Sequence, residues 1–274
     1  MGSASWTVLA AGTLGCLAPC GCGSSHDDAS VFPSTYGVED CDDLDEVRLG
    51  SYFVQNNQWG KGDLVDFEQC IRMEDAKTLP LRFTWRWPEV SPGQVKGYPF
   101  IGYGQDPWRP TSTGPGLPAV ASALTRLTVS YQMALTVSGK YNVAFDVWVT
   151  SAPGVTSPPE ANITRELMIW LEASEDARAE LAPIYVDDVV IDGEAYSFHH
   201  VTDVTDAGVD RAYLAFLKAD PERTGSTNLA EFIAYLVAQG QLGPEEYIRN
   251  VFLGAEIWFG TGELALEQFE VTVE

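Results

Sequence analysis

Three acidic residues stand out because each lies close to a tryptophan in a strand-like segment. Side chains alternate between the two faces of a β-strand. In "TRELMIWLE", Glu166 therefore shares a face with Met168 and Trp170, while the other face is largely aliphatic. A buried charge is costly unless it is paired. The Glu166 carboxylate is therefore expected either to reach solvent or to take part in chemistry.

The same pattern recurs in two other segments. In "YNVAFDVWVT", Asn142, Asp146 and Trp148 share the face opposite a row of apolar side chains. In "RNVFLGAEIWFG", Glu256 and Trp258 share a face in the same way. If the three strands lie in one sheet, the three acids converge on one concave surface that is lined by tryptophan rings.

A surface of this kind suits glycoside hydrolysis. That reaction needs two carboxyl groups flanking the scissile bond, one as proton donor and the other as nucleophile or base. A third acid beside the nucleophile can hold it in place by sharing a proton, and aromatic rings stack on the apolar faces of sugars. The alternative is chance, because 39 Asp and Glu residues place some outward carboxylates beside aromatic side chains.

Composition limits the partners that the chain can have. Its 274 residues include 39 Asp and Glu against 16 Lys and Arg, which gives a net charge of −23. A surface this acidic argues against nucleic acids and anionic membranes as partners, whereas a neutral polysaccharide is compatible with it. The 45% of hydrophobic residues suffice for the core of one sandwich or barrel domain, or at most two domains.

Most of the chain after residue 39 has the pattern of short strands. The segments are β-branched or aromatic and are bounded by Gly, Pro, Asp or Ser. They cover residues 124–137, 141–150, 165–172, 195–202, 211–219, 249–260 and 266–274. One segment, 228–240, is predicted to be a helix, with Asn228 as N-cap and Gly240 as its stop. We therefore predict an all-β fold, a two-sheet antiparallel β-sandwich (jelly roll, concanavalin-like), with a single helix packed on the outer sheet.

The N-terminal residues 1–22 predict an export leader. Their run "WTVLAAGTLGCLAP" is apolar but too short to span a bilayer. "TLGC", which ends at Cys16, looks like a lipoprotein cleavage box, so we expect either a lipid anchor at Cys16 or an ordinary cleaved signal. Residues 23–38 read as a linker and residues 39–274 as one domain. The chain is thus expected to be a bacterial secreted protein or outer-surface lipoprotein, and a monomer.

The cysteines and histidines favour a disulfide over a metal site. Cys41 and Cys70 form an isolated pair, which in an exported chain most often forms a disulfide; the alternative is two free buried thiols. His199 and His200 are adjacent on a predicted strand and point to opposite faces, so they cannot chelate one ion together. We expect no metal and no cofactor.

Seven segments, taken in order, resemble one protein family over roughly residues 39–274. They are "NNQWG", "FTWRWP", "QVKGYPFIGYG", "PW…GLP", "YNVAFDVW", "ELMIWL" and "GAEIWFGTGEL". The family they resemble is glycoside hydrolase family 12, the β-jelly-roll endo-β-1,4-glucanases. The resemblance implies a retaining enzyme that cleaves internal β-1,4 linkages of cellulose-type or mixed-linkage glucans.

The resemblance also implies roles for individual residues. Glu166 matches the family's nucleophile, Glu256 its general acid/base and Asp146 the acid that hydrogen-bonds the nucleophile. Trp59 of "NNQWG" matches a sugar-stacking tryptophan. The other predicted substrate-binding residues are Asn57, Asn142, Trp148, Met168, Trp170 and Trp258.

One departure from the family pattern leaves the substrate open. Ile257 and Trp258 follow the predicted acid/base, where family members usually have Pro or a small residue. This affects the subsite beyond the cleaved bond, so a xyloglucan-specific endoglucanase is an alternative. A second alternative, from another class of protein, is a non-catalytic glycan-binding jelly roll. The presence of all three acids argues against it, because a binding module needs none of them for turnover.

Overall fold

The computed structural model describes residues 37–274, apart from 76, 91–92, 110–111 and 207–208. The predicted leader 1–22 with Cys16, and all but the end of the predicted linker 23–38, lie outside the described residues. No helix in the described ranges combines the length and the apolar character needed to cross a bilayer.

The described chain is built mainly from strands. The strands are β1 (Val38–Asp40), β2 (Glu46–Leu49), β3 (Tyr52–Gln55), β4 (Glu68–Met73), β5 (Leu81–Trp87), β6 (Phe100–Gln105), β7 (Ser112–Thr113), β8 (Ala119–Val120), β9 (Leu127–Thr150), β10 (Ile163–Ala173), β11 (Tyr185–Ile191), β12 (Glu194–Asp206), β13 (Val209–Lys218), β14 (Thr224–Asn228), β15 (Tyr247–Ile248) and β16 (Asn250–Val273). The helices are α1 (Glu175–Leu181) and α2 (Leu229–Ala238), with short 3₁₀ turns η1 (Ala121–Ala123), η2 (Pro159–Asn162) and η3 (Ala182–Ile184).

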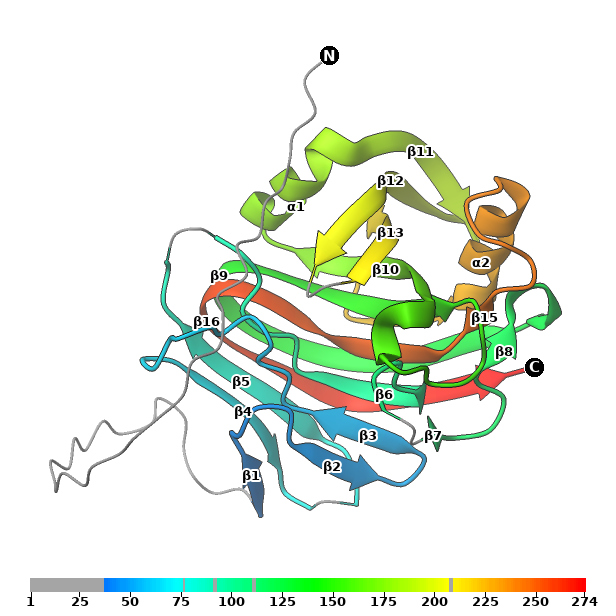
Figure 1. Cartoon of the computed structure of the whole chain (residues 1–274). Helices are drawn as coiled ribbons and strands as arrows, with labels where there is room; N and C mark the ends of the chain where they lie inside the picture. The colour runs from blue at the N-terminus through cyan, green and yellow to red at the C-terminus, as the bar shows by residue number, and fades with distance from the viewer. Residues whose placement is uncertain (1–36, 76, 91–92, 110–111, 207–208) are drawn as a thin grey trace, which may run out of the picture. The chain divides into compact units, whose positions relative to one another are not determined.

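Two long strands, β9 and β16, form the centre of the fold and pair along nearly their whole length (Figure 1). The second half of β9 and the first half of β16 belong to a sheet of order β2–β3–β6–β16–β9–β10–β13–β12–β11. Their other halves belong to a sheet of order β1–β4–β5–β16–β9–β14. Apolar side chains of both sheets, such as Phe83 of β5 and Phe145 of β9, form one buried core. The predicted two-sheet sandwich is confirmed.

Paired glycines mark the place where β9 and β16 pass from one sheet to the other. Gly139 and Gly260 are register partners, with φ of +103° and +112°, a region that favours glycine. A Cβ on Gly139 would lie 2.3 Å from the carbonyl oxygen of Phe259, and one on Gly260 would lie 2.0 Å from that of Ser138. The two backbones approach too closely at this corner for any side chain.

One pairing departs from the predicted antiparallel pattern. β13 runs parallel to β10, with Glu166 opposite Tyr213. Between these strands the chain forms α1, β11 and β12, so it reaches the sheet edge first and then returns strand by strand towards β10. Each of these strands is antiparallel to the one before it, so β13 runs in the same direction as β11. Both therefore run in the same direction as β10.

The predicted helix is confirmed as α2, where the side chain of Asn228 accepts a hydrogen bond from the Ala230 N–H at 3.3 Å. Its buried Phe232 packs edge-on against Tyr196 of β12 and Phe216 of β13. α2 therefore closes the core beneath these two strands.

A second helix, α1, was not predicted. It begins directly after β10, where the Ser174 hydroxyl caps it by accepting a hydrogen bond from the Ala177 N–H at 3.2 Å. Glu175 and Asp176 lie in its first turn, where the helix dipole favours negative charge. Its position bears directly on the predicted site, because it packs on the face that carries Trp170.

The predicted disulfide is confirmed: Cys41 and Cys70 are bonded and join the segment after β1 to β4. Cys70 is fully buried. The "NNQWG" loop starts directly after β3, and its Gln58 side-chain amide donates to the carbonyl of Cys41 at 2.9 Å.

Candidate active site

Strand register brings the three predicted acids to one face of one sheet. β9 lies between β10 and β16, and its residue Asp146 is opposite Met168 on β10 and Phe252 on β16. Glu166 of β10 is opposite Trp148 of β9, and Glu256 of β16 is opposite Asn142 of β9. All of these β9 residues differ by even numbers, so they point the same way. The two glutamates therefore flank Asp146 on the neighbouring strands.

The acids lie close enough to perturb one another. Asp146 is only 5% exposed. Burial, followed by the charges of Glu166 and Glu256, raises its pKa well above the usual 3.8, although Arg211 and Trp148 act in the opposite direction. A carboxyl group with such a pKa keeps its proton at pH values where surface carboxylates are ionised. Asp146 can therefore donate a hydrogen bond, and its Oδ1 is buried without a partner.

Two tyrosines lie close enough to the three acids for their pKa values to be affected. Burial, followed by the charges of all three acids, raises the pKa of Tyr98 and of Tyr213 well above 10. The Tyr98 hydroxyl donates to the carbonyl of Ala144 at 3.0 Å, and that of Tyr213 lies 3.3 Å from the sulfur of Met168. Both phenols thus remain neutral donors beside the acids.

Each glutamate has its own side-chain partner. The guanidinium of Arg211 on β13 donates to Oε2 of Glu166, with Nε at 2.6 Å. The side-chain amide of Asn142 donates to Oε2 of Glu256, and the backbone N–H of Glu256 donates back to Oδ1 of Asn142 at 3.4 Å. Asn142 is itself fully buried. The structure therefore places Asn142, predicted to bind substrate, as a support for the Glu256 carboxylate.

The expectation of an open surface lined by tryptophans needs correction. Trp148, Trp170 and Trp258 are 7%, 2% and 8% exposed, and Met168 is 1% exposed. They are covered because other elements pack onto the same face. α1 lies against Trp170, the Lys140 ammonium lies 5.0 Å from the ring centre of Trp258, and the Trp108 ring meets Trp148 edge-on at 4.7 Å. These side chains form a packed layer beside the acids, not free stacking platforms.

The exposed tryptophans come from loops. Trp59 is 43% exposed, and its backbone N–H donates to Oδ1 of Asn57 at 3.1 Å. The next residue, Gly60, donates to the carbonyl of Lys96 at 3.0 Å, and the N–H of Lys96 donates to the carbonyl of Ile257 at 2.7 Å. The Trp59 loop is thus tied to the residue that directly follows Glu256. Trp108, which was not predicted as a site residue, is 39% exposed and contacts Trp148.

Sequence reasoning missed Arg211, Tyr98 and Tyr213. Part of the signal was present in "RAYLAF", where Arg211 and Tyr213 alternate with the apolar residues of the core face. A cation placed on the polar face of a strand is informative only when the neighbouring strand is known. β10 and β13 lie 45 residues apart in sequence at the Glu166–Arg211 contact, so local pattern could not supply that neighbour.

The described residues offer little for a metal. Glu39, Cys41 and Cys70 are the one group of ligand-type side chains close enough together in these ranges, and the disulfide uses both sulfurs. His199 is buried, with its Nδ1 2.8 Å from the carbonyl of Leu181 and its Nε2 2.9 Å from the Ser197 hydroxyl.

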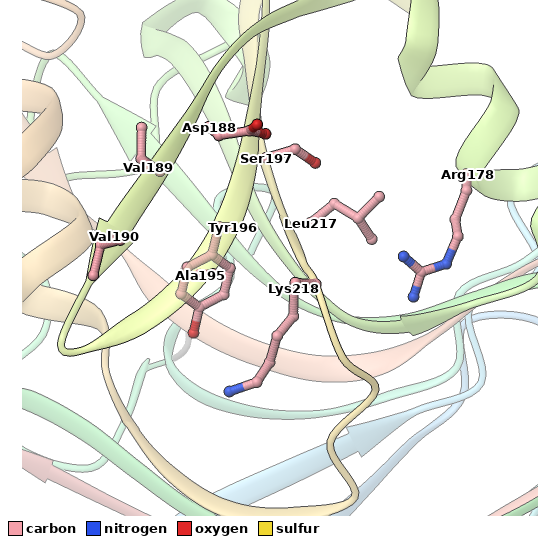
Figure 2. Close-up of a pocket in the computed structure, with 10 residues that line it drawn as sticks. Arg178, Asp188, Val189, Val190, Ala195, Tyr196, Ser197, Leu217 and Lys218 are labelled. Carbon is pink, nitrogen blue, oxygen red and sulfur yellow. The ribbon is translucent and has the colours of Figure 1, made fainter.

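A cavity of about 360 Å³ lies at β11, β12 and β13, away from the acids (Figure 2). Its lining includes Arg178, Asp188, Tyr196, Leu217 and Lys218. The Lys218 ammonium is paired with Glu222 at 2.6 Å and with Glu194 at 3.2 Å. None of the three acids lines this cavity, so it is separate from the candidate site.

Comparison with known proteins adds three findings. A family model described as "Glycosyl hydrolase family 12" matches residues 50–274. The chain is similar to "Endoglucanase S" of Pectobacterium parmentieri, with 28% identity over 237 residues that cover 85% of this chain and 86% of the relative. It is also similar to "Xyloglucan-specific endo-beta-1,4-glucanase A" of Emericella nidulans, with 25% identity over 253 residues that cover 89% of this chain and 95% of that protein.

Solved structures agree on the fold. A family 12 xyloglucanase from Bacillus licheniformis superposes with a TM-score of 0.77 at 24% identity, covering 86% of this chain and 100% of that one. Endoglucanase cel12A from Rhodothermus marinus superposes with a TM-score of 0.71 at 27% identity, covering 86% of this chain and 99% of that one.

Proposed function

This chain belongs to glycosyl hydrolase family 12, and from that premise we propose that it hydrolyses internal β-1,4 linkages of a glucan with retention of configuration. The observation that carries the proposal is the placement of Glu166 and Glu256 on the two strands that flank the buried Asp146. The similarity to an endoglucanase at 28% identity supports the same class of substrate.

The proposed mechanism is a double displacement. The Glu166 carboxylate attacks the anomeric carbon while Glu256 gives its proton to the leaving oxygen. Glu256 then removes a proton from a water molecule, which releases the sugar from Glu166. Asp146, which retains its proton because its pKa is raised, stabilises the neighbouring carboxylate charge as a hydrogen-bond donor.

Activity on a panel of glucans tests the proposal. The full chain is incubated with carboxymethylcellulose, barley β-glucan and tamarind xyloglucan, and reducing ends and product anomers are followed by assay and NMR. We expect release with the β-anomer formed first. An α-anomer formed first would contradict the retaining mechanism, and no release from any glucan would favour the binding-module alternative.

The role of Glu256 has a separate test. Glu256→Gln is expected to lower kcat/KM on polysaccharide by about 10²–10⁴-fold. On a dinitrophenyl cellobioside, whose leaving group needs no proton, the formation of the glycosyl-enzyme should be much less affected. Equal losses on both substrates would argue against Glu256 as the acid.

Substrate preference is the second question that the panel answers. Relatives named as xyloglucan-specific share 21–25% identity with this chain. We propose unsubstituted or mixed-linkage glucan as the main substrate and keep xyloglucan as the alternative. A kcat/KM at least tenfold higher on xyloglucan than on barley β-glucan would reverse this order.

We also propose that the chain is a monomer exported by a bacterium, with Cys16 either lipidated or removed with the leader. The Cys41–Cys70 disulfide supports an oxidising compartment. Mass spectrometry of the protein purified from the producing cell tests this. A mature N-terminus at Cys16 with a lipid mass indicates an anchor, a later N-terminus indicates a cleaved signal, and an intact leader contradicts both.

A further inference from the structure

An arginine binds the proposed nucleophile, Glu166, through only one of its two carboxylate oxygens. Both Nε and Nη2 of Arg211 contact the same oxygen of Glu166, Oε2, with Nε at 2.6 Å. Within the part of the chain that the structure describes, Oε1 of Glu166 accepts no hydrogen bond. The carboxylate is therefore fixed through one oxygen, while the other remains available to a substrate.

Arg211 is itself held in place. The exposed fractions of the Arg211 and Glu166 side chains are 7% and 10%. The guanidinium carbon lies 5.1 Å from the ring centre of Trp148, the residue opposite Glu166 on β9. A guanidinium does not lose its charge at any ordinary pH and stacks well on indole rings. A permanent positive charge thus lies on the β13 side of an otherwise acidic cluster.

We propose that Arg211 is a positioning residue of the hydrolysis, which holds Oε2 of Glu166 so that Oε1 is the attacking oxygen and which supplies a positive charge beside the three acids. This inference rests on the proposed function. Any negative charge on a neighbouring carboxyl group disfavours the charge of Glu166, and an adjacent cation offsets that effect. Nothing but Arg211 among the described contacts of Glu166 supplies such a cation.

The two chemical steps define what Arg211 does. In the first step the bond between Oε1 of Glu166 and the anomeric carbon forms, the glycosidic bond breaks, and the leaving oxygen takes the proton of Glu256. In the second step water adds to the anomeric carbon and gives a proton to Glu256, while the electron pair of the ester bond returns to the Glu166 carboxylate. Arg211 stabilises that carboxylate before the first step and as the leaving group of the second.

Variants of the full chain test the proposal. Arg211→Met is expected to lower kcat/KM by at least about tenfold. It should also move the acidic limb of the pH profile of kcat/KM to higher pH by about one unit, because the carboxylate ionises less readily without the cation. Arg211→Lys, which keeps the charge but not the two-nitrogen contact, should restore the acidic limb and only part of the rate.

A matched control is available at a second glutamate of β10, the strand that carries Glu166. Arg223 binds Glu172 of β10 through Nε at 2.6 Å and Nη2 at 2.7 Å, and Glu172 is also buried. Arg223→Met removes the same chemical group from a glutamate outside the cluster. It is expected to lower Tm and to leave the pH profile in place.

The outcomes separate the possible interpretations. If folded Arg211→Met, checked by circular dichroism, keeps the wild-type pH profile and loses only Tm, the pair is merely structural and the inference is overturned. If Arg211→Met does not fold, Arg211→Lys is the deciding variant. A wild-type rate with a wild-type pH profile would then show that the contact of two nitrogens with Oε2 is dispensable, and it would overturn the inference. Glu166→Gln is measured in parallel: if it keeps activity, the proposed function itself fails, whatever Arg211 does.

Discussion

Two glutamates of β10 form the same kind of ion pair in different surroundings. Glu166 and Glu172 each bind an arginine, Arg211 and Arg223 respectively, and both glutamates are buried. Arg223 takes both oxygens of Glu172, and the hydroxyl of Tyr141 donates to Oε1 of Glu172 at 3.2 Å as well. Arg211 takes only one oxygen of Glu166. Both oxygens of Glu172 thus accept hydrogen bonds, whereas only Oε2 of Glu166 does so among the described residues.

The two ion pairs also differ in their burial and in their neighbours. The Arg223 side chain is 48% exposed, whereas that of Arg211 is 7% exposed. Glu166 has the carboxyl groups of Asp146 and Glu256 as neighbours, whereas Glu172 lies outside this cluster. Residue type and burial therefore do not separate a structural carboxylate from a reactive one. Under the proposed mechanism, the two glutamates differ in unfilled acceptor capacity and in neighbouring carboxyl groups.

The largest expected effect comes from exchanging each glutamate for glutamine. Glu166→Gln should lower kcat by about 10³-fold or more, because no covalent intermediate can form. Glu172→Gln should leave kcat within about twofold and should lower the unfolding free energy by about 1–3 kcal/mol, the cost of weakened bonds to a charged partner. Activity assays and urea unfolding measure both. A folded Glu172→Gln protein without activity would contradict the distinction.

Two tryptophans allow a similar comparison between a buried and an exposed side chain. Trp170 is 2% exposed beneath α1, so Trp170→Ala should cost about 3–5 kcal/mol of unfolding free energy. Trp59 is 43% exposed, so Trp59→Ala should barely change stability. If its ring stacks on a sugar, KM on β-glucan should rise by about 3–10-fold. Thermal unfolding and glucan kinetics of both variants test this; an unchanged KM for Trp59→Ala would remove Trp59 from the binding surface.

Asp146 gives a prediction in which stability and activity diverge with pH. Its pKa is raised above 3.8 in the folded state, so between 3.8 and the raised value the folded protein binds more protons than the unfolded chain. Stability from this group is then complete below pH 3.8 and declines as pH rises through that window. Asp146→Asn cannot ionise, so its Tm relative to wild type should improve as the pH rises above 3.8.

The activity of Asp146→Asn should fall at the same time, because an amide stabilises the nucleophile differently from a protonated acid. Differential scanning fluorimetry across the pH range measures the first effect, with the exposed Asp187→Asn as a buffer control. A Tm difference from wild type that is constant with pH would show that Asp146 is ionised in the folded protein.

Strand parity predicted which side of its strand each acid occupies. The alternation of side chains has a fixed period of two, so "FDVW", "ELMIW" and "AEIW" each placed an acid and a tryptophan on the same face, as the register shows. The pattern depends only on neighbours along the chain. It could therefore be derived before the strand order was known.

Accessibility could not be derived in this way. Trp170 and Trp258 are buried because α1 and Lys140 pack onto their face. α1 has only seven residues, and its signals, a serine cap and two acids in the first turn, are common in loops as well. The Arg211–Glu166 contact depends on β13 returning parallel to β10, which no local pattern specifies. These features arise from tertiary structure.

The smallest expected effect tests whether Glu172 is as fully occupied as its contacts indicate. Tyr141 donates to an oxygen of Glu172 that Arg223 already binds, and burial together with the Glu172 charge raises the pKa of Tyr141 to about 12, so the phenol remains a donor. Tyr141→Phe should therefore lower the unfolding free energy by only about 0.5–1.5 kcal/mol and leave kcat unchanged. In a Glu172→Gln background most of this loss should disappear, because the charged acceptor is gone. Urea unfolding of the four proteins of this cycle gives the coupling, and additive losses would show that the hydroxyl acts through some other contact.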